Sequence, residues 1–327
     1  AFFQGITAYQ VSAILKAGVE LEVFTKIAQG NKTKEAIASA CGASERGIRI
    51  LCDALTALGH LTKNGDEYGL TEASATFLVK GLPTYIGGAA DFLASDMIRE
   101  GFDNFTEAVR TGTNATNEGG TVSPDNPVWV KFARGMMGMM FPQAQAMAEI
   151  AALDPDREVR ILDVAAGHGV FGIAMAKRFP KAQIFALDWA NVLAVASEHA
   201  ARFGVADRHH LIVGDAFSTD FQGTYDIVLL TNFLHHFDPE TNESLLRKVR
   251  AALSEGGRAF TLEFVPNPDR VTPPMDALFS SVMLAGTPSG DAYTLNELES
   301  MMSKAGFSGS TAYKMPAMGQ TLVVSER

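Results

Sequence analysis

The sequence predicts an α/β protein in which a doubly wound, mostly parallel sheet follows a helical N-terminal domain. Three observations lead to this prediction. From Val159 onward, short apolar runs alternate with segments of helical apolar periodicity, which is typical of a parallel sheet covered on both faces. A glycine-rich turn follows the first of these runs, and a hairpin signal ends the helical part near the N-terminus. We place the domain boundary between residues 110 and 111, giving domains 1–110 and 111–327.

The composition is that of a globular protein with a sizeable core. Of the 327 residues, 47% are hydrophobic and 20% are charged. The net charge of −10 argues against a protein that binds the phosphate backbone of nucleic acids, and the apolar stretches are too short to span a membrane. The two cysteines, Cys41 and Cys52, form neither a disulfide framework nor a metal motif. We therefore expect a cytoplasmic protein with reduced thiols and no metal.

The N-terminal domain opens with a helical segment over residues 1–30. A shorter helix is expected over residues 34–40, where Thr33 can act as its N-cap. The following helix can be capped by Ser44 and ends at Gly59; its apolar residues recur at helical spacing.

A β-hairpin follows these helices. Residues 61–63 and 68–70 flank Asn64-Gly65-Asp66-Glu67, whose Asn-Gly pair favours a tight turn. Two helices and a hairpin form a winged-helix arrangement, in which the second helix reads DNA. Here that helix carries a balanced set of charges rather than a basic stripe: Glu45, Arg46, Arg49 and Asp53. The sequence therefore favours packing or dimerisation over DNA binding.

Residues 111–127 form a polar loop, after which a helix is expected over residues 128–153. This helix contains the methionine-rich run 135–141. Methionines adapt to irregular shapes, so the run could line a pocket for an apolar substrate. The interpretation we favour is that it belongs to the core or to a subunit interface.

The C-terminal domain is expected to alternate strands and helices. Strands are predicted at 159–164, 183–187, 210–214, 225–230, 258–264, 308–314 and 320–325, and helices at 170–179, 190–203, 239–253 and 294–305. Because only a short loop separates the last two strands, we expect these to pair antiparallel.

The glycine turn after the first strand spells Gly-x-Gly-x-x-Gly with Gly167, Gly169 and Gly172. Between a strand and a helix, such a turn lets the backbone approach a ligand closely. The motif alone is weak evidence, because glycines also end strands for structural reasons.

Polar residues follow each strand at the edge where a ligand would bind. They are Asp163, Asp188, Asp215, Asn232, His235, His236 and Glu263. Asp188, about twenty residues past the glycines, suits the ribose hydroxyls of a nicotinamide dinucleotide or of S-adenosylmethionine. Asp163 would be unfavourable beside a pyrophosphate, whereas an acidic rim suits the ammonium and sulfonium of S-adenosylmethionine. Asp215 with Phe217 suits an adenine.

Together these motifs resemble the class I S-adenosylmethionine-dependent methyltransferases. The resemblance rests on Asp163-x-x-x-Gly167-x-Gly169, Asp188, Gly214-Asp215-Ala216-Phe217 and Leu234-His235. The winged-helix N-terminus narrows it to small-molecule O-methyltransferases of the caffeate/hydroxyindole type, including bacterial enzymes. The resemblance implies a Rossmann-like methyltransferase sheet and a homodimer whose subunits exchange their N-terminal helices.

The resemblance also implies site residues. S-adenosylmethionine, which leaves as S-adenosylhomocysteine, would be bound by Asp163, Gly167, His168, Gly169, Asp188, Trp189, Asp215, Ala216, Phe217 and Asn232. His235 falls at the position of the general base, and Glu263 at one of the acids that orient it. A histidine of pKa about 6.5 can take the proton of a phenol of pKa about 10 as the methyl group transfers. Alternatively, His235 is a structural histidine bonded to backbone.

Several residues depart from the pattern of the plant members. His236-Phe237 replaces Asp-Trp, Thr231 replaces Lys, Asn232 replaces Trp, and Ala292 replaces a second orienting acid, with Asp291 one residue away. The segment 269–290 caps the acceptor site in the resembled family; from its composition alone it could equally form a dimer contact.

We therefore predict an O-methyltransferase acting on a hydroxyl of a small aromatic or polyketide-like molecule. One alternative is an enzyme of the same fold that transfers to carbon or nitrogen or no longer transfers a methyl group. The others are a nicotinamide-dependent oxidoreductase and a winged-helix regulator that senses a ligand.

Overall fold

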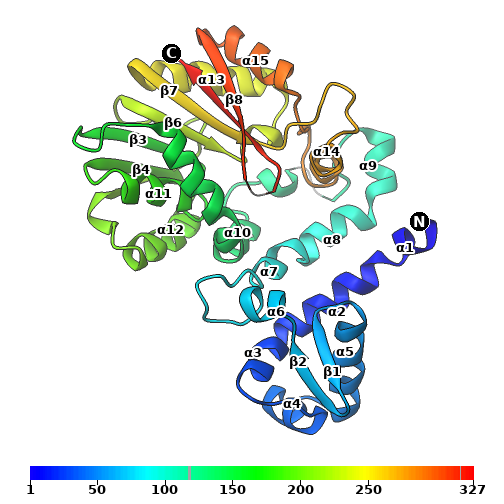
Figure 1. Cartoon of the computed structure of the whole chain (residues 1–327). Coiled ribbons are helices and arrows are strands. Elements are labelled where there is room, and N and C mark those ends of the chain that lie inside the picture. The colour runs from blue at the N-terminus through cyan, green and yellow to red at the C-terminus, as the bar shows by residue number, and fades with distance from the viewer. Residues whose placement is uncertain (117–118, 317) are drawn as a thin grey trace. The chain divides into compact units, whose positions relative to one another are not determined.

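The computed structural model covers residues 1–327 and describes all of them except 117–118 and 317. It divides into two compact units, Ala1–Ser95 and Asp96–Arg327 (Figure 1). No helix among the described residues is long and apolar enough to cross a membrane.

The N-terminal unit is helical with one hairpin. Its elements are α1 (Phe2–Ile6), α2 (Ala8–Glu20), α3 (Val23–Ala28), α4 (Lys34–Cys41), α5 (Glu45–Ala57), β1 (Leu61–Asn64), β2 (Glu67–Leu70), α6 (Glu72–Phe77) and α7 (Ala89–Leu93). Both predicted caps are confirmed: the side chains of Thr33 and Ser44 accept hydrogen bonds from backbone amides of the helices that they precede. The hairpin is also confirmed, with β1 and β2 antiparallel.

Two of the charges of α5, Arg49 and Asp53, are paired with each other. The carboxylate of Asp53 accepts hydrogen bonds from Arg49 at 2.9 Å, from Lys63 at 2.6 Å and from the Tyr68 hydroxyl at 2.8 Å. This helix therefore offers no free basic stripe to DNA. Cys52 is buried, which raises the pKa of its thiol to about 12 and keeps the thiol protonated.

The first two helices expose large apolar side chains. Phe2, Phe3, Ile6 and Tyr9 are 81%, 79%, 63% and 68% exposed. A run of this kind is uncommon on a monomer and typical of an interaction surface.

The C-terminal unit begins with α8 (Asp96–Asp103) and α9 (Phe105–Thr111), so its first residue lies before the predicted boundary at 110/111. Both helices contact α14 (Pro274–Gly286) far along the chain, which makes them part of this unit. The remaining elements before the sheet are the short 3-10 helix η1 (Gly120–Val122) and α10 (Val128–Ala151).

The sheet and its helices follow the predicted alternation within a few residues. They are β3 (Val159–Val164), α11 (Val170–Arg178), β4 (Ala182–Asp188), α12 (Ala190–Arg202), η2 (Ala206–Arg208), β5 (His209–Val213), β6 (Tyr225–Thr231), η3 (Leu234–His236), α13 (Pro239–Ala252), β7 (Leu253–Glu263), α15 (Leu295–Lys304), β8 (Gly309–Lys314) and β9 (Thr321–Glu326). The largest difference is β7, which begins five residues early because Leu253 already pairs with Tyr225 across a register shift.

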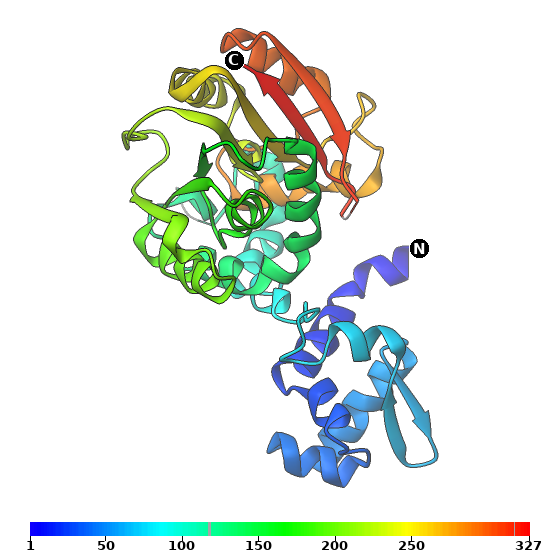
Figure 2. The ribbon, with the colours of Figure 1, turned by 60° about the vertical axis from the view of Figure 1, so that its left-hand side comes forward.

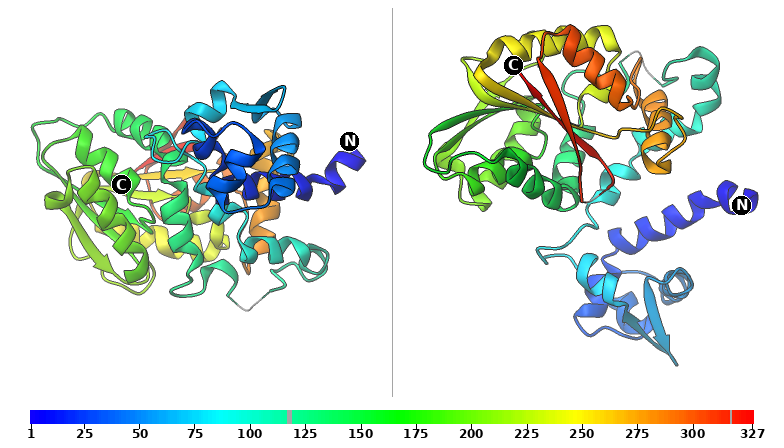
Figure 3. Two further views of the ribbon diagram at one scale, coloured as in Figure 1. Left: turned by 90° about the horizontal axis from the view of Figure 1, so that it is seen from below. Right: turned by 45° about the horizontal axis from the view of Figure 1, so that its top comes forward.

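The seven strands lie in the order β5-β4-β3-β6-β7-β9-β8 (Figure 2). The first five are parallel. The last two strands, β8 and β9, pair antiparallel, as predicted, and β9 also pairs antiparallel with β7. Helices cover both faces: α10, α11 and α12 contact one another on one side, and α13 packs with α15 on the other (Figure 3). Within α10, Met136 and Met140 are buried, which supports the interpretation of the methionine run as core.

Candidate active site

The strand order creates one place where a ligand can enter the edge of the sheet. The chain leaves β3 for β4 and β5 on one side and returns to β6 on the other side of β3. At such a switch point the loops after β3 and β6 diverge and leave a crevice. The polar residues predicted from the sequence follow these strands and their neighbours at the same edge.

Two glycines of the turn after β3 have left-handed backbone conformations. Gly167 and Gly169 have φ of +58° and +71°. Gly172, one turn into α11, has another role: a Cβ there would lie 2.6 Å from Cγ2 of Ile184 on β4. The three glycines thus shape the turn and let the helix pack closely on the sheet.

Asp188, at the end of β4, is tied to this turn. Its Oδ2 accepts a hydrogen bond from the amide of Gly167 at 2.8 Å, and its Oδ1 accepts one from the amide of Trp189 at 2.7 Å. Burial raises the pKa of this carboxyl to about 6, although its side chain keeps a partly exposed surface. Because each carboxylate oxygen can accept a second hydrogen bond, Asp188 can still bind two hydroxyl groups.

The expected acidic rim does not form at Asp163. Its side chain is completely buried beneath the turn, where Oδ2 accepts from the amide of Gly172 at 3.1 Å and Oδ1 has no partner among the described residues. Burial raises the pKa of this carboxyl to about 8. Asp163 therefore supports the turn from inside, and a contact with the cofactor stays a prediction.

Replacing Asp163 by asparagine should flatten the pH dependence of stability. The raised pKa means that the fold is favoured while the carboxyl is protonated, and that this contribution is lost as the pH rises from about 4 to about 8. Asparagine keeps an oxygen for Gly172 and does not titrate. Between pH 5 and pH 9, the free energy of unfolding should therefore fall more in the wild type than in Asp163→Asn, by up to ~4 kcal/mol. Urea unfolding at both pH values measures this, and parallel pH profiles would contradict it.

The other residues predicted around the turn lie at different depths. The ring of His168 is buried against Phe132, with ring centroids 5.4 Å apart, and its Nδ1 accepts a hydrogen bond from the amide of Val170 at 3.2 Å. Burial lowers the pKa of His168 to about 3, which keeps the ring neutral. Trp189 is partly buried and packs against the apolar cluster of Ala133, Val192 and Val195.

The loop after β5 presents Asp215 next to a group of aromatic rings. Oδ1 of Asp215 accepts from the amides of Phe217 and Ser218 at 2.8 and 3.0 Å, which fixes the loop. The ring of Phe217 stands edge-on to Phe237, with centroids 4.8 Å apart, while Ala216 is buried. A carboxylate beside an apolar wall is suited to a flat ring that carries an amine.

The predicted catalytic pair joins the loop after β6 to the end of β7. Nδ1 of His235 lies 2.5 Å from Oε2 of Glu263, and both side chains are buried. The other carboxylate oxygen of Glu263 accepts from the amides of Phe233 and Leu234 at 3.1 and 2.8 Å. The carboxylate therefore orients the imidazole through Nδ1 and leaves Nε2 as the atom that can act on a substrate.

The residue that replaces the second orienting acid is buried, and its acidic neighbour is paired elsewhere. Ala292 is completely buried, and the carboxylate of Asp291 pairs instead with Arg270 at 3.2 Å. The ring of Phe279 from α14 stands edge-on to His235, with centroids 4.8 Å apart. A Cβ on Gly290 would lie 2.3 Å from the carbonyl oxygen of His235, so the segment after α14 packs directly against the catalytic loop.

Two glutamines that sequence reasoning missed hold Asn232. Its backbone has φ of +56°, and its side-chain oxygen accepts a hydrogen bond from Gln320. Gln320 in turn accepts one from Gln143 of α10 at 2.9 Å. Both glutamines are completely buried, but they lie far from Asn232 in the chain, and their only sequence signal is an amide in an apolar context.

The glycine turn, the acids after β4 and β5 and the oriented histidine after β6 define an S-adenosylmethionine-dependent methyltransferase. The family comparison agrees. Residues 95–308 match the O-methyltransferase domain, and residues 3–80 match the O-methyltransferase dimerisation domain. The chain belongs to this family. The alternatives of a nicotinamide-dependent oxidoreductase and of a winged-helix regulator are therefore wrong.

The relatives cover nearly the whole chain. A 3-hydroxy-5-methyl-1-naphthoate 3-O-methyltransferase from Streptomyces sahachiroi is 30% identical, over 95% of this chain and 90% of its own length. A crystal structure of a candidate O-methyltransferase from Nostoc punctiforme PCC 73102 has a TM-score of 0.94 and is 49% identical, covering 100% and 98% of the two chains. Human N-acetylserotonin methyltransferase, solved with S-adenosylmethionine, shares the fold with a TM-score of 0.86 at 22% identity, covering 100% and 96%.

The residues present fit this cofactor. Three features lie at this edge of the sheet: a glycine turn without bulky side chains, the carboxylate of Asp188, which can accept hydrogen bonds from two hydroxyls, and the carboxylate of Asp215 beside aromatic rings. Carboxylates favour a cationic ligand over a diphosphate. S-adenosylmethionine is therefore the cofactor for which this chain is built.

Proposed function

We propose that this enzyme methylates a hydroxyl group of a small aromatic or polyketide-like molecule and that His235 is the general base. The observation that supports it is the buried pair of His235 and Glu263 at the switch point of the sheet. The naphthoate relative acts on a ring hydroxyl, in agreement with the proposal. The aromatic ring of Phe279 beside His235 suits a flat acceptor.

In this mechanism the chain positions two reactants and moves one proton. The cofactor supplies an electrophilic methyl group on a sulfonium. Asp188 would hold the ribose hydroxyls of the cofactor, Asp215 its adenine side, and the backbone of Gly167 its methionine portion. His235 takes the proton of the acceptor hydroxyl at Nε2, while Glu263 holds the imidazole and stabilises its positive charge. Alignment of the acceptor oxygen with the methyl group supplies much of the acceleration.

Calorimetry of the cofactor tests the binding half of this proposal. Wild-type protein should bind S-adenosylmethionine and S-adenosylhomocysteine, and Asp188→Ala should weaken both by ~100-fold or more, since two hydrogen bonds to a charged group are lost. Lys181→Ala, which removes an exposed charge before β4, is the control and should bind normally. NADH should not bind; tighter binding of NADH would refute the assignment of the glycine turn.

Mass spectrometry and NMR of a methylated acceptor test the transfer half. The methyl group should sit on oxygen, and its position separates O-transfer from the alternatives of C- and N-transfer. Ala292 in place of the second acid leaves one carboxylate to orient His235, which is sufficient to hold the ring through Nδ1.

The dimerisation-domain match supports a homodimer. We propose that the exposed side chains of α1 and α2, Phe2, Phe3, Ile6 and Tyr9, lie in its interface, where burial in a second copy would remove them from water. We also propose a cytoplasmic location, in agreement with two free cysteines, and a small-molecule acceptor as the only other partner.

A further inference from the structure

A buried carboxylate on α14 has no role in the mechanism above. The side chain of Asp276 is 1% exposed, yet neither of its oxygens has a hydrogen-bond partner among the described residues. A carboxyl group removed from water without a partner is costly to the fold. Such a group is expected where a ligand completes its hydrogen bonds.

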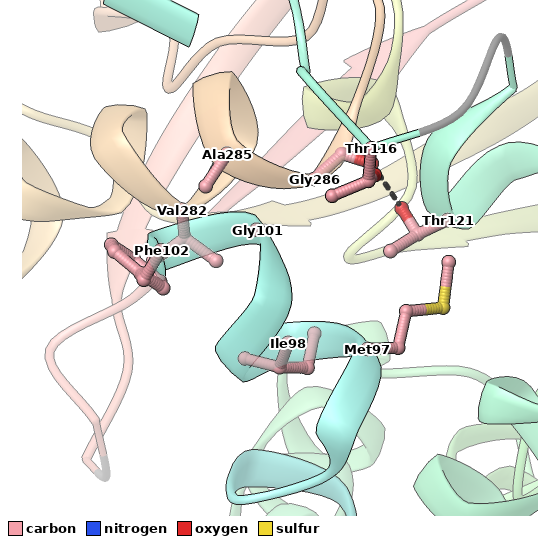
Figure 4. Close-up of a pocket in the computed structure, with 9 residues that line it drawn as sticks. All are labelled: Met97, Ile98, Gly101, Phe102, Thr116, Thr121, Val282, Ala285 and Gly286. Atoms are coloured by element: carbon pink, nitrogen blue, oxygen red, sulfur yellow. Dashed lines mark hydrogen bonds between the residues drawn. The ribbon is translucent and has the colours of Figure 1, made fainter. Parts of the chain in front are cut away.

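The orientation of α14 is fixed by contacts near its C-terminal end. A Cβ on Gly101 of α8 would lie 2.8 Å from the carbonyl oxygen of Ala285, so the two helices are in close contact there. The hydroxyl of Thr121 donates to the carbonyl of Gly286 at 3.1 Å, beside a small apolar pocket between α8 and α14 (Figure 4). These contacts set which face of α14 turns toward the catalytic loop.

Asp276 shares that face with Phe279 and Met283, because residues three and seven apart lie on the same side of a helix. The ring of Phe279 contacts His235 and stacks on Phe264, which follows β7, with centroids 4.0 Å apart. Asp276 precedes Phe279 by about 4.5 Å along the helix axis. Its carboxylate therefore lies on the catalytic side of α14, one turn from the ring that touches His235.

One cation lies in electrostatic range of Asp276 without pairing with it. Lys314 ends β8, and the strand register aligns Lys314 with Thr321 and Thr321 with Glu263, at the catalytic edge of the sheet. The exposed ammonium of Lys314 donates to the hydroxyl of Thr321 at 2.9 Å, and no ion pair with Asp276 forms within 4.0 Å. Burial outweighs the attraction of Lys314 and raises the pKa of Asp276.

We propose that Asp276 determines acceptor specificity by binding a hydrogen-bond donor of the acceptor, an ammonium or a second hydroxyl, remote from the hydroxyl that is methylated. This inference rests on the proposed function. A site built to bind such a donor rejects an analogue that lacks it, because the buried carboxylate then stays unpaired. The preferred acceptors are accordingly phenols that carry a donor on a second substituent.

The test uses matched pairs of acceptors and two measurements. Phenols that carry an aminoalkyl, a hydroxyalkyl or an alkyl group of equal length are assayed for methylation by the dimeric wild type, Asp276→Asn and Asp276→Leu. The wild type should prefer a donor-bearing member by at least ~10-fold in kcat/KM, and Asp276→Leu should lose this preference because kcat/KM falls for the donor-bearing member and does not fall for the alkyl member. If Asp276→Asn loses only the preference for the aminoalkyl acceptor, the donor that Asp276 binds is an ammonium. If Asp276→Asn keeps a preference for the hydroxyalkyl acceptor, the donor is a hydroxyl.

Thermal unfolding of the unliganded protein is the second measurement. If the carboxyl group of Asp276 has no partner until an acceptor binds, Asp276→Leu should raise the Tm, since leucine fills the space without an unpaired polar group. Lys314→Met is the control and should leave the acceptor preference unchanged. Calorimetry with S-adenosylhomocysteine, which should bind all variants alike, separates failure of this inference from failure of the proposed function.

Four results would overturn the inference. They are an acceptor preference that Asp276→Leu does not change, a wild-type preference for the alkyl member, a lower Tm in Asp276→Leu, and a weaker dimer in Asp276→Leu by sedimentation. The third would assign Asp276 a structural ion pair, and the fourth a contact with the second subunit. If no acceptor in the panel is methylated, the Tm comparison decides.

Discussion

Replacing His235 by alanine is expected to lower kcat for methyl transfer by ~10²–10⁴-fold, because the acceptor hydroxyl then has no base to take its proton. The KM for S-adenosylmethionine should change little, since the imidazole lies after β6 and the ribose-binding acid after β4. His235→Gln should show a similar loss, because glutamine fills the space and cannot accept the proton. Steady-state kinetics with a phenolic acceptor measures both parameters.

His210 provides a matched control. It is an exposed histidine on β5 whose Nε2 lies 2.8 Å from the side-chain oxygen of Gln183. His210→Ala should keep the wild-type rate. Under the same conditions, His235→Ala should show the loss of kcat stated above. Full turnover by this variant on the true acceptor would leave alignment alone to explain catalysis.

Removing the carboxylate of Glu263 is expected to destabilise the protein by about 3–5 kcal/mol, which is the usual cost of breaking a buried charge-assisted network. Glu263→Ala leaves Nδ1 of His235 and the amides of Phe233 and Leu234 without their acceptor. Glu263→Gln keeps an oxygen for the two amides. It places an NH2 group against His235, which favours the tautomer with the proton on Nε2. This variant should therefore fold but lose turnover.

Urea unfolding of the two variants separates these effects. Glu255→Ala, on an exposed position of the same strand, is the control and should change the free energy of unfolding by less than ~0.5 kcal/mol. A Glu263→Gln variant with wild-type kcat would show that the carboxylate serves only to fix the loop.

The polar residues of the site were predictable because parallel strands end at one edge. His235 and Glu263 lie 28 residues apart, but they follow neighbouring strands β6 and β7, and alternation of strands and helices is readable from apolar periodicity. The caps Thr33 and Ser44 were equally predictable, since a cap depends on residues within one turn.

Side-chain direction was not predictable in the same way. Asp163 lies near the end of its strand, as the other acids lie near the ends of theirs, yet its side chain is buried beneath the turn. Because β3 is buried on both faces, its sequence shows no alternation of polar and apolar residues from which the direction of the side chain could be predicted. Asn232 depends on Gln320 and Gln143, which belong to a turn and to a helix elsewhere in the chain. The extent of the C-terminal unit likewise depends on contacts of α8 and α9 with α14.

The sequence by itself determined the order of the elements, the strand–turn–helix that receives the cofactor and the proximity of His235 and Glu263, since each of these depends on local pattern or on strand order. Only the tertiary structure decided which carboxylates face the site and which lie under it. Asp163 and Asp276 look alike in sequence as single acids in apolar stretches; packing buries one against Gly172 and the other on the side of α14 that carries Phe279. Burial of a charge depends on neighbours distant in the chain, and these meet only when the sheet and its helices are assembled.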